Sequence, residues 1–461
     1  MMKFTVQGLA VLASTAIAIG AAAGWVSAEQ SDPRLLSFSD DTGTIGTVDT
    51  AGPLDTDNPF FQSLGTNGRS CASCHQASDA WTVTPAHLRA RFAQSQGLDP
   101  IFRSNDGSNC EGASPASLSE RRAAFSLLLT KGLVRIGLTV PSNAEFTVVS
   151  VDDPYRCGGP LENVSAYRRV LPSTNLRFLS TVMWDGRETK PGLSIHDDLT
   201  IQAKDAILGH AQATLMPTDA DIQSIVTFET ALFTAQARDH AAGSLHADGA
   251  TGGPRELSQQ AFFIGINDPL GGNPTGAAFD PRAFTLFDRW IQSKRDSGDE
   301  RRDARAAIAR GETLFNTRPV VITGVAGLND NPAVGPTFSG TCTTCHDTPN
   351  SGNHSVSAPL NIGLADVSRR TPDLPLYTLR NKITGDEIQT SDPGRATISG
   401  KWKDVGKFKG PILRGLAGRA PYFHNGSAAT IAEAVDFYDT RFALGLTEHE
   451  KSDLVAFLLT L

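Results

Sequence analysis

The chain has 461 residues, of which 40% are hydrophobic and 20% charged, and its net charge is −8. This length suffices for two domains with sizeable cores, and the composition is that of an ordinary globular protein. The acidic balance argues against nucleic acid and anionic membrane surfaces as partners.

The first 28 residues have the pattern of a secretory signal peptide. Lys3 gives a positive start, and an apolar, alanine-rich stretch covers 4–26. Val-Ser-Ala at 26–28 fits the small-residue rule for cleavage, so the mature protein is predicted to begin at Glu29. An uncleaved membrane anchor stays open as the alternative, because the stretch is long enough to span a bilayer. In both cases the body of the protein is expected in the periplasm or otherwise outside the cytoplasm, with no membrane contact after cleavage.

Six cysteines suit an oxidising compartment. Four of them fall into two repeated motifs. The remaining pair, Cys110 and Cys157, is predicted to form a disulfide, with two free buried thiols as the alternative.

Two Cys-x-x-Cys-His motifs carry the strongest signal. Thiols three residues apart can reach both vinyl groups of one haem, and the next residue, a histidine, can ligate its iron. A zinc or redox Cys-x-x-Cys is less consistent with a histidine that follows at once in both motifs. The sequence therefore predicts two covalently bound haem c groups, attached at Cys71-Ala-Ser-Cys74-His75 and at Cys342-Thr-Thr-Cys345-His346.

The two halves of the chain repeat one another. Residues 215–228 align without gaps to residues 444–457, and each copy begins with a threonine N-cap, continues with acidic residues and then has apolar residues at helical spacing. Upstream, Met-Trp-Asp-Gly at 183–186 parallels Phe-His-Asn-Gly at 423–426. The repeat predicts a duplicated haem domain closed by a terminal helix.

The repeat also suggests the domain boundaries. We expect an N-terminal cytochrome c domain over residues 29–240, a linker region over 241–300 rich in Gly, Asp and Pro, and a C-terminal cytochrome c domain over 301–461 that opens with a helix from 302 to 315. The predicted fold is mainly α, a tandem duplication with long loops and little strand.

The second iron needs a ligand opposite His346. The four methionines are Met1, Met2, Met183 and Met216, so a His/Met haem in the second half is excluded unless the first half supplies the methionine. The candidates are Tyr438, His424, His354 and His449.

Five segments carry a family resemblance: Lys-Phe-Lys-Gly-Pro-Ile-Leu-Arg at 407–414, Ala-Pro-Tyr-Phe-His-Asn-Gly at 420–426, Val-Asp-Phe-Tyr at 435–438, Met-Trp-Asp-Gly-Arg at 183–187 and Thr-Thr-Cys-His-Asp-Thr-Pro-Asn at 343–350. Together they resemble the bacterial dihaem cytochrome c peroxidase/MauG family. The likeness covers most of the chain outside roughly 95–165 and 241–300.

The resemblance implies a division of labour between the haems. In that family one haem meets peroxide, the other exchanges electrons, and a tryptophan lies between them. Trp184 would be this bridge. Tyr438 stands where the peroxidases carry a distal methionine and MauG carries a tyrosine, so it would be the second ligand of the His346 haem. A buried core residue is the alternative for each, and His424 would hydrogen-bond near that haem.

At the first haem the resemblance is less complete. Gln202 matches a distal glutamine, but Gln212 stands where the family has a glutamate that manages the protons of peroxide, and an amide cannot exchange protons as a carboxylate does. His210 could act as the acid/base instead, could ligate the iron, or could do neither. His87 is a weaker candidate ligand, and His75 would be the proximal one.

The family also implies a calcium ion between the domains. Pro421 is kept, but Arg419 replaces the usual threonine, and the expected asparagine is missing from its place. Calcium is therefore doubtful for this chain.

The expected function is a peroxidase-like oxidoreductase that uses hydrogen peroxide or dioxygen at the first haem and exchanges electrons through the second. Its donor would be a small cytochrome or a cupredoxin. Two alternatives remain: a non-catalytic electron carrier and an oxygenase related to rubber oxygenases.

Overall fold

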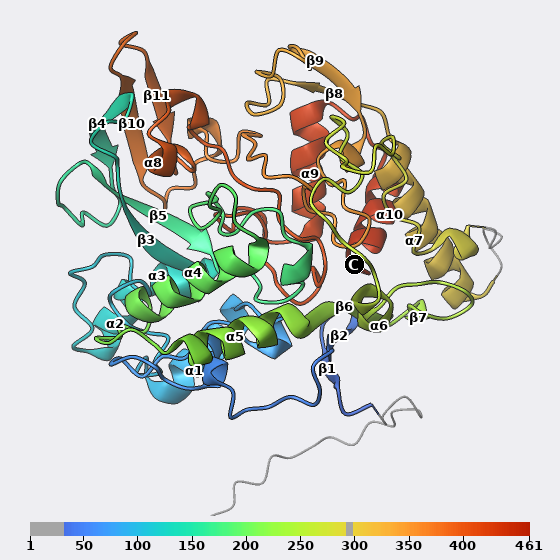
Figure 1. Cartoon of the computed structure of the whole chain (residues 1–461), viewed down its shortest axis with the longest axis horizontal. Helices are drawn as coiled ribbons and strands as arrows, with labels where there is room; N and C mark the ends of the chain where they lie inside the picture. Colours follow the sequence, from blue (N-terminus) through green and yellow to red (C-terminus); the bar gives the residue numbers. More distant parts are fainter. Residues whose placement is uncertain (1–31, 292–297) are drawn as a thin grey trace, which may run out of the picture. The chain divides into compact units, whose positions relative to one another are not determined.

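The computed structural model describes residues 32–291 and 298–461, so the predicted signal peptide lies outside the described residues. Residues 34–461 form one compact unit (Figure 1). Its α-helices are α1 (Pro85–Ser95), α2 (Leu118–Ala124), α3 (Ser126–Lys131), α4 (Ile195–Gly209), α5 (Asp219–Ala231), α6 (Pro254–Ser258), α7 (Glu300–Thr317), α8 (Ala396–Ser399), α9 (Ile431–Phe442) and α10 (Glu448–Leu458).

Eleven strands occur in the described part of the chain. They are β1 (Leu35–Ser39), β2 (Gly43–Asp49), β3 (Leu133–Thr139), β4 (Phe146–Asp152), β5 (Asn163–Arg169), β6 (Leu232–Asp239), β7 (Gly243–Ser244), β8 (Val320–Thr323), β9 (Thr337–Gly340), β10 (Leu376–Asn381) and β11 (Glu387–Thr390). Short 3-10 turns follow the same order: η1 (Pro59–Phe61), η2 (Cys71–Ser73), η3 (Ala77–Asp79), η4 (Leu176–Phe178), η5 (Asp288–Trp290), η6 (Cys342–Thr344), η7 (Val367–Arg369) and η8 (Trp402–Asp404).

The prediction of a mainly α fold is wrong. The structure has 30% helix and 17% strand, and its strands form one four-stranded, one three-stranded and two two-stranded sheets. The strands are short and pair with distant partners, as Thr47 does with Thr234 and Thr147 with Arg380. Short strands of this kind leave little local periodicity in the sequence, and β6 follows directly on α5, whose helical pattern hides it.

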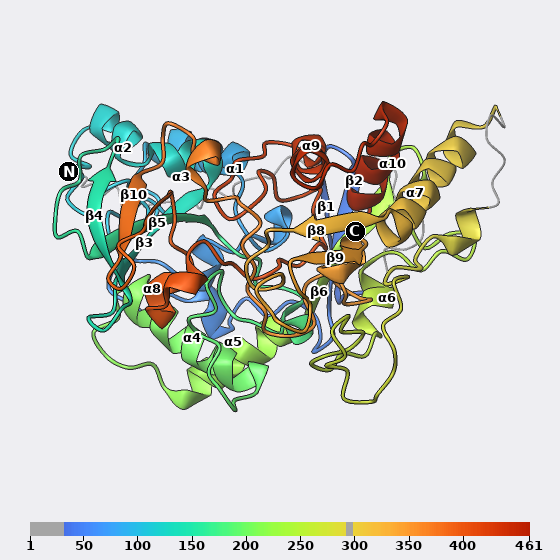
Figure 2. The ribbon, with the colours of Figure 1, turned by 90° about the horizontal axis from the view of Figure 1, so that it is seen from above.

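One sheet joins the two halves of the chain. Strand β10 pairs antiparallel with β4, although more than two hundred residues separate them, and β11 adds to its other edge. Figures 1 and 2 both show β4 beside β10. The halves therefore share backbone hydrogen bonds as well as side-chain packing.

The predicted closing helices are confirmed as α5 and α10. Each begins with a capping box, from Thr218 to Asp221 and from Thr447 to Glu450, which satisfies free N–H groups of the first turn. α5 lies beside α4, and α10 lies beside α7 (Figure 1). The helix expected over 302–315 is confirmed within α7.

Each half has its own aromatic core beside its closing helix. In the first half, Phe228 of α5 packs against Phe60 and Trp81, with ring centroids 5.0 and 5.6 Å apart. In the second half, Phe457 of α10 occupies the equivalent position and packs against Phe284 and Phe315, at 5.7 Å from each. Burial of such rings is a large part of what holds each half together.

The segment expected as a linker contributes to the second core. Phe284, Phe287 and Trp290 are buried in one cluster with residues of α7 and α10.

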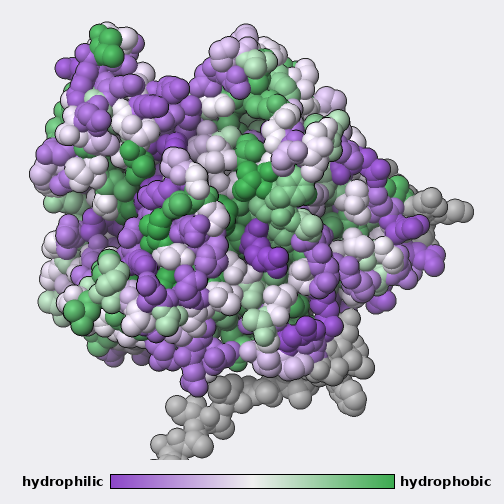
Figure 3. Space-filling model, in the orientation of Figure 1, coloured by the Kyte–Doolittle hydropathy of each residue, from purple (hydrophilic) through white to green (hydrophobic). Residues whose placement is uncertain are grey.

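Hydrophobic and hydrophilic residues are mixed over the face drawn in Figure 3. Within the described residues, no helix has the length and hydropathy needed to cross a membrane. The predicted disulfide between Cys110 and Cys157 is confirmed.

Candidate functional site

The two Cys-x-x-Cys-His motifs adopt the same local structure. The first cysteine of each motif begins a 3-10 turn, η2 or η6, and the second cysteine directly follows that turn. Reciprocal hydrogen bonds between the residue before the turn and its third residue close it. The amide N–H of the histidine then donates to the carbonyl of the first cysteine, from His75 to Cys71 and from His346 to Cys342. None of these four cysteines forms a disulfide.

Both histidines are held in the orientation that an iron ligand needs. His75 Nδ1 donates to the carbonyl of Trp81 at 3.0 Å, and His346 Nδ1 donates to the carbonyl of Gly352 at 2.7 Å. The acceptor lies six residues after the histidine in each case. This bond leaves Nε2 as the free, unprotonated nitrogen. Burial lowers the pKa of His75 to about 4 and also lowers the pKa of His346, so both rings are neutral at neutral pH.

Each motif opens into a large, mainly apolar cavity. The first cavity, lined by Cys71, Cys74 and His75, contains about 1440 Å³ of space free of protein atoms, including its opening to solvent. The second, lined by Cys342, Cys345 and His346, contains about 1810 Å³. Two cysteines outside any disulfide, a neutral histidine nitrogen and an apolar cavity at each motif fit a covalently attached haem.

A metal-only reading of the motifs finds no support in the geometry. In residues 32–291 and 298–461, no group of three or more His, Cys, Asp or Glu residues is arranged to hold a metal ion. The cysteines of each motif are also not joined to each other. The motifs therefore lack, among the described residues, the ligand cluster that a zinc site needs.

The two cavities share one wall. Seven residues line both of them, namely 169–172, Trp184, Lys409 and Ile412. Trp184 is 8% exposed, and its indole Nε1 donates to the carbonyl of Arg169 at 2.8 Å. The predicted bridging residue thus lies between the two cavities, in a position that main-chain contacts fix.

The duplicated turns meet at this wall. Met183 and Phe423 both have a φ of +67°, and each turn is closed by the amide of its glycine, which donates to the carbonyl of residue 183 or 423. Trp184 and His424 are the second residues of these turns, and their rings lie 6.2 Å apart. The equivalent residues of the two halves are therefore neighbours.

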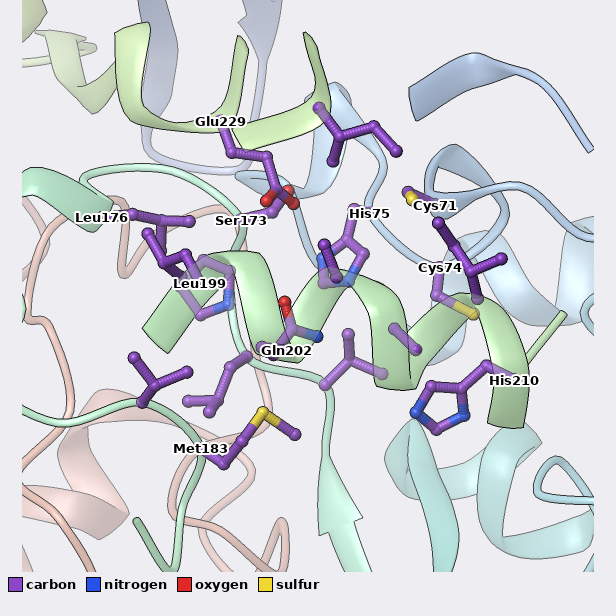
Figure 4. A pocket seen from close by; sticks show the side chains of 18 of the residues that line it. Cys71, Cys74, His75, Ser173, Leu176, Met183, Leu199, Gln202, His210 and Glu229 are labelled. Carbon is purple, nitrogen blue, oxygen red and sulfur yellow. The ribbon is translucent and has the colours of Figure 1, made fainter. Parts of the chain in front are cut away.

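In the first cavity, Gln202 and His210 both come from the region of α4 (Figure 4). His210 is the residue at the C-terminal end of this helix, and its side chain is 45% exposed at the edge of the cavity. Gln212 does not line the cavity: it is exposed, and its side-chain oxygen accepts a hydrogen bond from Asn67 Nδ2 at 3.3 Å. The structure therefore brings together Gln202 and His210 but not Gln212.

Asp106, which the sequence did not point to, orients His210. Its carboxylate pairs with His210 Nδ1 and with the guanidinium of Arg69. Burial would raise the pKa of Asp106, but the hydrogen bond with His210 and the charges of His210 and Arg69 lower it below its usual value. Asp106 lies in a loop more than a hundred residues before His210, so no spacing rule could connect them.

Glu229 is a second residue that the sequence reasoning missed. It lies on α5, is buried, and lines the first cavity (Figure 4). Burial raises its pKa to about 8, so the carboxyl is mainly protonated at neutral pH. The sequence did contain a clue to its burial. Glu229 continues the helical spacing of Ile222, Ile225 and Val226, at a position where a buried apolar residue is expected.

In the second cavity, three of the four candidate ligands are present. Tyr438, His424 and His354 line it, whereas His449 lies on the exposed side of α10 near Asp453. His87 also lies outside both cavities, bound to Asp79. The rings of Tyr438 and His346 lie 6.4 Å apart at 72°. Burial raises the pKa of Tyr438, so its phenolate form needs a neighbouring cation such as ferric iron.

The imidazole ring of His424 is fully buried and has no hydrogen-bond partner among the described residues. It is 1% exposed, neither ring nitrogen is bonded, and burial lowers its pKa to about 4. The ring stacks on Phe408 at 3.9 Å. Unpaired buried nitrogens are rare, and one at a cavity wall indicates a partner that a bound group would supply.

Comparison with known proteins finds partial matches. No family model matches the chain. Cytochrome-c peroxidase IdrP1 of Pseudomonas sp. (strain SCT) is 31% identical over 192 residues, which cover 37% of this chain and 42% of the relative. Cytochrome-c peroxidase IdrP2 of Denitromonas iodatirespirans is 33% identical over 132 residues, or 26% of this chain and 36% of the relative.

A third relative matches over fewer residues but with a higher sequence identity. Cytochrome c551 peroxidase of Nitrosomonas europaea is 40% identical over 77 residues, which are 16% of this chain and 23% of the relative. The matches to these curated relatives thus span less than half of their lengths. A solved structure of a MauG-like protein associated with microbial copper homeostasis aligns over 87% of this chain with 17% identity and a TM-score of 0.39, too distant a likeness to support an inference.

Proposed function

We propose that the chain is a member of the bacterial dihaem cytochrome c peroxidase/MauG family and an exported two-haem oxidoreductase that reduces hydrogen peroxide. The observation that carries this proposal is the pair of cavities with identical Cys-x-x-Cys-His geometry and one shared wall at Trp184. The disulfide between Cys110 and Cys157 supports an oxidising compartment such as the periplasm.

The residues that would hold each group are those of the two motifs. Cys71 and Cys74 would attach the first haem, and His75 would bind its iron. Cys342, Cys345 and His346 would hold the second haem in the same way, with Tyr438 as the further iron ligand. When bound, each haem supplies an iron that stores one electron, and the first supplies an iron that can meet peroxide.

The reaction consumes two electrons and two protons: hydrogen peroxide, two electrons and two protons give two water molecules. Gln202 can hydrogen-bond peroxide in the first cavity through its amide. His210 is the group we propose to move the protons, because Asp106 fixes Nδ1 and leaves Nε2 available at the cavity edge. The 45% exposure of His210 gives it contact with solvent for proton exchange. Gln212, outside the cavity, has no role in this proposal.

Trp184 is proposed to connect the two haems. It lies in the shared wall, and its ring neighbours His424, which faces the second cavity. A small cytochrome or a cupredoxin would supply the electrons, and the contact of Trp184 with His424 would connect the residues that hold the two haems.

The test is a stoichiometric reaction of the haem-loaded protein. The fully reduced protein is mixed with hydrogen peroxide, and the amount of haem oxidised is measured against the peroxide consumed. The proposal expects one peroxide to oxidise both haems of one chain. No reaction would indicate an electron carrier, and consumption of dioxygen without reaction with peroxide would indicate an oxygenase.

A further inference from the structure

The calcium ion that the family implies between the halves does not fit the residues of this chain. Arg419 stands two residues before Pro421, where the family usually has a threonine at its calcium site. Its carbonyl oxygen is already bonded, because it accepts a hydrogen bond at 3.1 Å from Nη2 of Arg169. Within the described residues, no cluster of carboxylates is arranged for a metal at this place.

Arg169 is surrounded by main-chain carbonyl groups. Nη1 donates to the carbonyls of Lys131 and Gly132 at 3.1 and 3.2 Å, and Nη2 donates to Val83 at 2.7 Å as well as to Arg419. Three of the four acceptors belong to the first half of the chain and the fourth to the second half. Within the described part of the chain, no ion pair engages the guanidinium, which lies in a residue that is only 5% exposed.

Such a set of acceptors suits a guanidinium better than calcium. Calcium takes six to eight oxygen ligands, usually with carboxylates among them, whereas a guanidinium needs only hydrogen-bond acceptors in a plane. The backbone also makes room for it: Gly132 has a φ of +63°, and a Cβ there would lie 1.8 Å from Arg169 Nη1. Burial and the nearby charge of Arg419 lower the pKa of Arg169 only to about 10, so it remains cationic at neutral pH.

The backbone of Arg169 reaches the duplicated turns. Its carbonyl accepts the indole N–H of Trp184, and its amide donates to the carbonyl of His424 at 2.6 Å. Arg169 thus contacts the bridging tryptophan through its backbone, and through its guanidinium it joins carbonyl groups from both halves of the chain.

We propose that the guanidinium of Arg169 replaces the calcium ion at the junction between the two halves, so that this protein assembles and keeps its two-haem arrangement without a divalent cation. This inference does not depend on the reaction proposed above. It concerns what holds the halves together and would apply equally to an electron carrier.

The direct test uses the haem-loaded wild-type protein. Its calcium content is measured by elemental analysis against its iron content, and its thermal unfolding and optical spectrum are recorded in EGTA and in millimolar calcium chloride. We expect no stoichiometric calcium, and the same unfolding midpoint and spectrum in both buffers. One calcium per chain, or a midpoint that falls in EGTA, would overturn the proposal.

A variant pair tests the role of the guanidinium itself. Arg169→Ala should lower the unfolding midpoint, and millimolar methylguanidinium should restore part of the loss because it can occupy the four carbonyls. Arg177→Ala is the control, since Arg177 is exposed and lies over the ring of Phe233. An equal response of both variants to methylguanidinium would contradict the proposal. If Arg169→Ala does not fold, the wild-type measurements decide alone.

Discussion

The rings of Trp184 and His424 lie 6.2 Å apart at an interplanar angle of 65°, and the two residues hold the same position in the two copies of a duplicated turn. In each copy the third residue, Asp185 or Asn425, accepts a hydrogen bond from the amide two residues later at 3.1 Å. The duplication therefore places equivalent side chains in contact at the wall between the two cavities. A side chain that connects two haems would have to lie in this wall, between the two cavities.

Replacing the tryptophan tests this connection. Trp184→Phe keeps an aromatic ring but shortens it and removes the indole N–H, and we expect peroxide turnover to fall about tenfold or more, a change of at least about 1.4 kcal/mol in the barrier. The matched control is Trp402→Phe, because Trp402 packs on Phe146 and lines neither cavity. Stopped-flow absorbance at the two haems measures the effect. Equal rates for wild type and Trp184→Phe would exclude the bridging role.

His210 and His87 form a natural test and control. Both pair through Nδ1 with a buried aspartate, and their side chains are 45% and 55% exposed, but only His210 lines a cavity. His210→Gln should lower peroxide turnover by about a hundredfold, the usual contribution of a general acid/base, and flatten its pH profile. His87→Gln should leave the rate unchanged. A changed resting spectrum in His210→Gln would instead indicate that His210 is an iron ligand.

The number of haems can be counted with cysteine variants. Removing both thiols of one motif, as in Cys342→Ala with Cys345→Ala, should halve the covalently bound haem, because each motif holds one group. Cys110→Ala with Cys157→Ala is the control, since this pair forms the disulfide and should leave both haems attached. Mass spectrometry of the denatured protein gives the count. Two haems in the Cys342/Cys345 variant would show that this motif is not an attachment site.

A buried ion triad joins the two halves beside Trp184. Arg168 pairs with Asp185 at 2.5 Å and with Asp392 at 2.7 Å, and all three side chains are at most 4% exposed. Arg168→Met should lower the free energy of unfolding by about 3–5 kcal/mol, because it leaves buried carboxylates without their partner. Arg187→Met is the control: Arg187 reaches the same Asp185 from a more exposed position and should cost about 1 kcal/mol or less. Urea titration monitored by circular dichroism measures both.

The same triad predicts a pH dependence of stability. Burial would raise the pKa of Asp185, but the charges of Arg168 and Arg187 lower it to about 2 in the folded protein. A lowered folded pKa means that the stabilisation is complete above the unfolded pKa, near 4, and is lost as the pH falls towards 2. The difference between wild type and Arg168→Met should therefore shrink over this acid range. A difference that stays constant from neutral pH to pH 2 would contradict this assignment.

The sequence predicted the duplicated parts of the molecule well. The closing helices could be placed because threonine caps and helical spacing are local signals, and both appear in α5 and α10. The disulfide followed from an even remainder of cysteines once the two motifs were set aside. The parallel between the turns at 183 and 423 extended to their backbone angles and hydrogen bonds.

The sheets could not be predicted in the same way. Strands β2 and β6 pair across almost two hundred residues, and β4 pairs with β10 across the two halves. Such pairing depends on which segments meet in space, and a short strand carries little information about its partner. The result was a prediction with too little strand.

The first cavity shows the same limit at the level of single residues. Gln202 lies on α4 and His210 directly follows it, and both were found by likeness to the family. Asp106 comes from a loop that the resemblance does not cover. Gln212 was expected in the cavity because it stands where the family has a glutamate, but α4 ends at Gly209 and the chain then turns, with a φ of +56° at Gln212. The side chain therefore lies outside the cavity, bonded to Asn67.

The most direct test of the two-haem account is to add one equivalent of hydrogen peroxide to the oxidised, haem-loaded protein and follow its optical spectrum. The account predicts a rapid change in the absorption of both haems, because peroxide meets the iron in the first cavity and the second haem responds through the shared wall at Trp184. An unchanged spectrum would contradict it, since the first haem would then be closed to peroxide.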